Sequence, residues 1–75
     1  MNKARKERLS RVITILETVQ NTIDNILAEE NEAKDAIARH FAGTDGFGVM
    51  EENASILETA SSDLDIIIGS LEDVG

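Results

Sequence analysis

The strongest chemical feature of the chain is a cluster of cations at its N-terminus. Five of its seven Lys and Arg residues lie within the first eleven positions: Lys3, Arg5, Lys6, Arg8 and Arg11. Such groups could bind a phosphate-bearing ligand or an acidic protein partner. Alternatively, they match acids within the assembly, since cations oppose the dipole at a helix N-terminus. In a hairpin, four acids near the C-terminus would lie close enough for this: Asp63, Asp65, Glu72 and Asp73.

A glycine-rich segment at 43–48 and the residues beside it form a second candidate site. His40 is the only histidine and the chain has no cysteine, so His40 alone can build neither a catalytic triad nor a familiar zinc site. The segment precedes a helix start and could receive an anion, but it lacks the Lys-Ser/Thr pair of a P-loop. Phe47 lies between glycines, where an exposed aromatic ring would suit a partner protein. The candidate ligand- or partner-binding residues are therefore Arg5, Arg8, Arg11, Arg39, His40 and Phe47.

Four carboxylates at Glu29, Glu30, Glu32 and Asp35 could in principle hold a divalent cation across a dimer. The di-iron bundle proteins require Glu-x-x-His, and this motif does not occur in the chain. We therefore expect a solvated acidic face, with no metal and no cofactor. No catalytic residue stands out, so the sequence gives no support for an enzyme.

Two stripes of apolar residues flank the glycine-rich segment, and most of their steps are three or four residues, the spacing of one face of a helix. The first contains Leu9, Val12, Leu16, Val19, Ile23, Ile26, Ala33 and Ile37, and the second contains Met50, Leu57, Ala60, Leu64, Ile67, Leu71 and Val74. This pattern predicts an all-α fold with a single domain over residues 1–75. We expect a two-helix antiparallel hairpin with a long helix at about 3–42, a turn at 43–48 and a helix at about 49–73.

The unequal helix lengths and a few residues predict further details. The shorter second helix should cover the first only from about Phe41 back to about Leu16, leaving the basic turns beyond its end. Glu30 interrupts the first stripe, so either the helix bends there or the stripe opens to water. Gly43 is placed to close the first helix, and Gly69 could allow a close approach of the helices.

Further isoleucines beside the stripes predict an oligomer. They widen the apolar surface beyond what one partner helix can cover, and we expect them at an oligomer interface: Ile13, Ile15, Ile56, Ile66 and Ile68. A chain of 75 residues gains at most about 3–5 kcal/mol from one hydrophobic core. We therefore expect a homo-oligomer, a dimer or higher, that forms a helical bundle.

Composition limits the remaining partners and the compartment. The net charge is −8, which disfavours direct nucleic-acid binding, and the only aromatic residues are Phe41 and Phe47, too few for a base-stacking surface. No segment reaches the ~20 apolar residues that a membrane span needs. The N-terminus lacks a signal-peptide pattern, and the absence of cysteine suits a reducing compartment, so we expect a cytoplasmic protein.

Several short motifs are spread along most of the chain. They are Asn2-Lys3-x-Arg5-Lys6 before an Ile/Leu-rich helix, Glu29-Glu30-x-Glu32-Ala33, Met50-Glu51-Glu52, and Leu64-Asp65 followed by Ser70-Leu71-Glu72-Asp73. In these motifs the chain resembles a family of small acidic helical-hairpin proteins encoded by bacteriophages and other mobile elements of gut bacteria, usually regarded as hypothetical proteins. The family offers no catalytic residue to carry over. The resemblance implies a protein that acts by stoichiometric binding.

These observations predict a small non-enzymatic protein that binds a host component, such as a defence protein, through a homo-oligomeric helical bundle. One alternative is sequestration of an anionic nucleotide signal at subunit interfaces by Arg5, Arg8, Arg11 or Arg39. Another is mimicry of DNA by the acidic faces. The sequence leaves both alternatives open.

Overall fold

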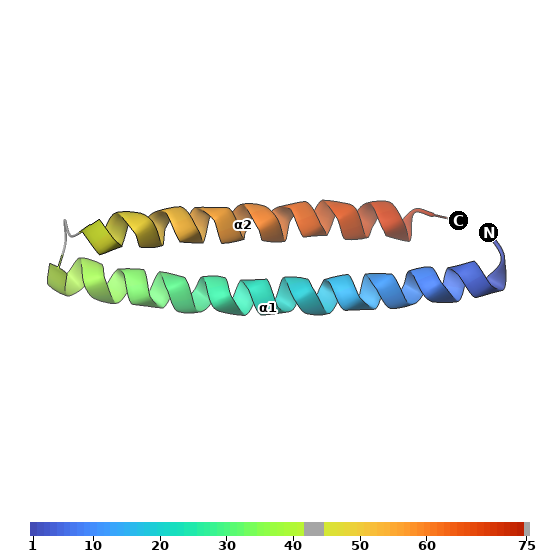
Figure 1. Ribbon diagram of the computed structural model, residues 1–75, viewed down its shortest axis with the longest axis horizontal. Coiled ribbons are helices and arrows are strands. Elements are labelled where there is room, and N and C mark those ends of the chain that lie inside the picture. Colours follow the sequence, from blue (N-terminus) through green and yellow to red (C-terminus); the bar gives the residue numbers. More distant parts are fainter. Residues whose placement is uncertain (42–44, 75) are drawn as a thin grey trace.

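The computed structural model contains two long helices, α1 (Lys3–Phe41) and α2 (Asp45–Glu72). They run side by side in opposite directions, and the two termini lie at the same end (Figure 1). The structure describes the backbone of residues 1–41 and 45–74 and the side chains of 1–37 and 48–74. Within these ranges there is no strand, and no helix has a stretch apolar enough to cross a membrane. The prediction of an all-helical hairpin is confirmed.

The connection between the helices is shorter than predicted. α2 begins at Asp45 rather than near Val49, so Gly46 and Gly48 are helical. The predicted turn at 43–48 is therefore wrong over residues 45–48, and Gly43 lies outside the described residues. A glycine costs only about 1 kcal/mol relative to alanine within a helix. Packing of α2 against α1 offsets this cost.

A side-chain cap fixes the start of α1. The Oδ1 atom of Asn2 accepts a hydrogen bond of 2.9 Å from the backbone N–H of Arg5, and the Asn2 carbonyl accepts one of 3.0 Å from Lys6. The first bond satisfies a donor that a helix start otherwise leaves unpaired, and the second is the first backbone bond of the helix itself. From this cap α1 runs as one continuous helix through Glu30, which is half-buried.

The core is a narrow strip of side chains between the helices. The residues on α1 that face α2 are at least half-buried and include Leu9, Ile13, Leu16, Gln20, Ile23, Leu27, Lys34 and Ile37. Their counterparts on α2 are Met50, Ala54, Leu57, Ser61, Leu64, Ile68 and Leu71. Among the described side chains only Ala54 and Ile68, each 6% exposed, are buried hydrophobic residues. Two helices bury one strip and leave their other sides to solvent.

Part of the predicted apolar stripe lies outside this core. Five members of the predicted stripes are 42–47% exposed, so their assignment to the core-facing stripe is wrong: Val12, Val19, Ile26, Ile67 and Val74. The neighbouring residues Ile13 and Ile68, expected beside the stripe at an oligomer interface, belong to the core instead. The reason is that Gln20 occupies a core position. A search for apolar residues alone selects Val19 in place of Gln20. At this and similar positions the predicted core residue is therefore the one directly before the true core residue.

α2 also covers more of α1 than predicted. A surface groove between its C-terminal end and the start of α1 is lined by Lys6, Leu9, Ser10, Ile13, Leu71, Glu72 and Val74. The expected limit at Leu16 is wrong because α2 starts a turn earlier than predicted. The earlier start brings the C-terminal end of α2 closer to the start of α1. A Cβ atom added to Gly69 would meet nothing within 4 Å. Gly69 therefore does not mark a close approach of the helices.

Candidate interaction surfaces

Each helix carries a second apolar stripe beside the core. On α1, Val12, Val19 and Ile26 are seven residues apart, and each lies directly before a core residue. In heptad terms they are g positions, the neighbours of the core on one side. The full set of exposed apolar residues at g and c positions is Val12, Ile15, Val19, Ile26, Val49, Ile56, Ile67 and Val74. We call these eight residues the apolar face.

The stripes of the two helices lie on the same side of the hairpin. Ile26 of α1 and Ile56 of α2 line one surface groove together with Glu30, Asn53 and Leu57. Ile26 and Asn53 are both g positions, which antiparallel helices place next to each other, and Ile56 is the adjoining c position. Of the predicted interface residues, Ile15 and Ile56 belong to this face. Ile66, which is 69% exposed, lies about 100° around the helix from Ile67 and outside the face.

The opposite edge of the core is polar and acidic. The Gln20 side-chain amide donates hydrogen bonds of 3.1 Å to the Ser61 carbonyl and to Oδ1 of Asp65. The Ser61 hydroxyl donates a bond of 2.5 Å to Oδ1 of Asp24. These four residues form a polar cluster that links α1 to α2. This cluster was not predicted from the sequence, because its members are separated by up to 45 positions.

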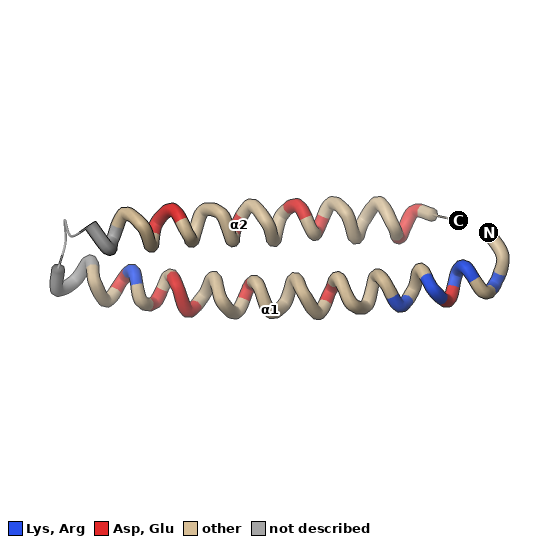
Figure 2. The backbone as a smooth tube through the Cα atoms, viewed as in Figure 1, with Lys and Arg blue, Asp and Glu red and all other residues tan. Residues whose placement is uncertain are grey.

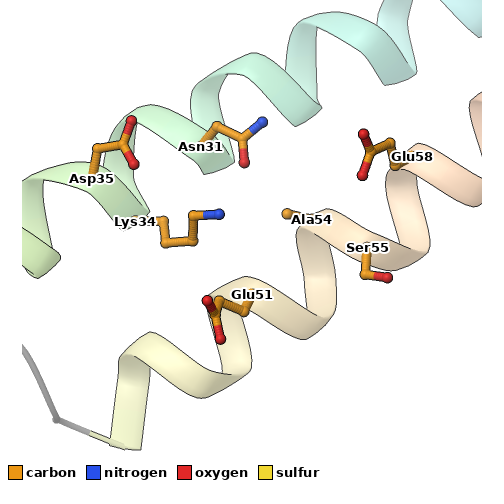
Figure 3. Close-up of a pocket in the computed structure, with 7 residues that line it drawn as sticks. All are labelled: Asn31, Lys34, Asp35, Glu51, Ala54, Ser55 and Glu58. Atoms are coloured by element: carbon orange, nitrogen blue, oxygen red, sulfur yellow. The ribbon is translucent and has the colours of Figure 1, made fainter.

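Nearer the turn, the same edge opens into a groove lined by Asn31, Lys34, Asp35, Glu51, Ala54, Ser55 and Glu58. Figure 3 shows Lys34 extending from α1 towards α2, with Glu51 and Glu58 on the facing helix. Lys34 is the only cation between positions 12 and 38. It occupies a core position and places its charge among carboxylates. No group of three or more His, Asp or Glu in residues 1–37 and 48–74 is arranged to hold a metal ion.

The basic residues of the N-terminus gather at one end of the hairpin, and acidic residues occur along the rest of both helices (Figure 2). Of the acids proposed to match them, Glu72 lines the same groove as Lys6. Asp65 instead accepts the bond from Gln20, and Asp63 lines a groove with Ile56 and Ala60. Asp73, between Glu72 and Val74, lies at the same end of the hairpin, so the structure brings two of these acids to the basic end.

For three predicted binding residues, only the position along the helices is described. Arg39 and His40 lie in the last turn of α1 and Phe47 in the first turn of α2, and their side chains lie outside the described ones. Arg5, Arg8 and Arg11 are exposed on the first turns of α1, far from that end of the hairpin. The six residues therefore belong to two separate ends of the molecule. The chain matches no protein-family model, no curated protein and no solved structure.

Proposed function

We propose that the chain is a non-enzymatic binding protein, encoded by a phage or mobile element, that acts stoichiometrically on a host defence component through a homo-oligomeric helical bundle. The observation that carries this proposal is the exposed apolar surface of the hairpin. Ten large apolar side chains are exposed among the described residues, whereas only two hydrophobic residues are buried. A surface of this kind, bordered by charged residues, is typical of proteins that function by association.

A titration tests this proposal. Expression in a bacterial host that carries a defence system should restore plaque formation by a phage sensitive to that system. With the purified target, inhibition should saturate at a fixed molar ratio, because a stoichiometric inhibitor is consumed by its target. Substoichiometric inhibition, or no protection against any defence system tested, would contradict the proposal. Strong weakening of target binding by salt would favour DNA mimicry by the acidic edge instead.

Sequestration of an anionic nucleotide is a second candidate, favoured by the concentration of cations at one end of the hairpin. Cyclic and linear nucleotides should then raise the melting temperature, because a ligand that binds only the folded state stabilises it. The Arg11→Glu variant should lose this rise and keep the solution mass of the wild type. Glu17 lies outside the basic cluster, so the opposite charge reversal, Glu17→Arg, serves as the control and should keep the response. No nucleotide-dependent shift in the wild type would exclude this candidate.

A further inference from the structure

We infer that the apolar face pairs with the same face of a second copy, with the two hairpins reversed end to end. The inference rests on the homo-oligomeric part of the proposed function and specifies its interface. Within the described residues, the face runs along most of the hairpin and spans both helices. It leaves the polar cluster and the acidic edge on the outside of the resulting four-helix bundle.

The size of the face fits a partner of the same shape. The hairpin measures 57 × 14 × 12 Å, so the footprint of one broad side is roughly 800 Å², enough to hold the area that each partner buries in a standard interface. The exposed stripe repeats the three- and four-residue steps of the core itself. A helix with apolar residues at such steps packs best along another helix of similar length. A second hairpin supplies two of them.

Charges at the two ends of the α1 stripe fit the end-reversed arrangement. The stripe continues beyond its apolar residues to Arg8 at its N-terminal end and to Glu29 at its C-terminal end. Both are c positions, like Ile15. Both residues are exposed. They are 21 positions apart on one helix, roughly 30 Å, so they cannot reach each other within one chain.

A two-fold axis near Val19 brings these charges together. Reversing one hairpin about this axis places Arg8 beside Glu29 of the second copy and repeats the contact at the other end, as an isologous interface requires. The apolar residues Val12, Ile15, Val19 and Ile26 then fill the space between the two charge pairs. Pairing with like ends together would instead place α1 of each copy against α2 of the other, so Arg8 would no longer meet Glu29 of the second copy.

Light scattering and sedimentation of the full chain test the interface. The wild type should have twice the 8.2 kDa mass of one chain. Val19→Glu and Ile56→Glu should shift the species to one chain and raise the dissociation constant at least 100-fold. Their matched controls, Thr18→Glu and Ile66→Glu, introduce the same charge outside the face and should stay dimeric. Circular dichroism at high concentration establishes that each variant is helical.

A charge swap and a distance test the orientation. Arg8→Glu and Glu29→Arg should each weaken the dimer about tenfold, and the double variant should recover wild-type affinity because both pairs re-form. Since the chain has no cysteine, Ala4→Cys can carry a single spin label. The end-reversed dimer separates the two labels by roughly 40 Å, whereas pairing of like ends brings them within roughly 20 Å.

Several results would overturn the inference. A helical monomer at high concentration, equal effects of Val19→Glu and Thr18→Glu, failure of the double swap to restore affinity, or the short label distance would each do so. None of these measurements needs a host target, so their outcome is separate from that of the plaque and inhibition tests.

Discussion

The Ile68→Ala variant is expected to lose about 2–5 kcal/mol of unfolding free energy, the usual cost of truncating a large buried aliphatic side chain. Ile68 is 6% exposed and belongs to the strip of side chains between α1 and α2. A core of this size supplies at most about 3–5 kcal/mol in total. The variant should therefore be largely unfolded at micromolar concentration, as measured by circular dichroism during urea titration.

Ile66→Ala is the matched control for this variant. It removes the same atoms from the same helix two positions away, but Ile66 is 69% exposed. Its unfolding free energy should change by less than about 0.5 kcal/mol. Equal losses in the two variants would show that α2 does not present Ile68 to α1.

Gln20→Leu is expected to raise the unfolding free energy by about 1–2 kcal/mol, the gain from partly burying a leucine side chain. Gln20 occupies a half-buried core position between Leu16 and Ile23 on α1. Its acceptors on α2 remain accessible to water, because Asp65 is exposed and Ser61 is only half-buried. Removing the amide therefore leaves no buried acceptor unsatisfied.

The increase should appear as a higher urea midpoint with an unchanged slope. Asn21→Leu, which adds a leucine to the exposed neighbouring position, serves as the control and should change stability little. A loss of stability in Gln20→Leu would mean that the hydrogen bonds to Ser61 and Asp65 contribute more than apolar burial at this site.

The fold was predictable from apolar spacing and one breaker segment, but the orientation of each helix about its axis was not. Two apolar stripes run along α1 one residue apart, through Val19 and Ile26 or through Gln20 and Leu27. Choosing between them requires knowing that an amide lies in the core, which depends on acceptors contributed by α2. The start of α2 was misplaced because glycine was taken to end helices, whereas tertiary packing overrides its modest cost.

Some of the candidate sites were likewise predictable from the sequence, and others were not. The basic end follows directly from the positions of Arg5, Arg8 and Arg11 in the sequence. The apolar face could have been found from the seven-residue spacing of Val12, Val19 and Ile26, once the core had been assigned to the other stripe. The position of Lys34 among the acids of α2 depends on which turns of the two helices lie opposite each other. Sequence periodicity does not contain that information.

The polar cluster has a consequence for how the two helices find their alignment. The apolar core repeats every seven residues, so sliding α2 along α1 by one repeat would still set apolar side chains against each other. Such a slide moves Gln20 roughly 10 Å from Asp65 and Ser61 and breaks their hydrogen bonds. A single polar core position is known to select one register at a cost in stability. In this hairpin the cluster also determines which turn of α1 lies opposite each turn of α2, and hence whether the two halves of the apolar face form one continuous surface.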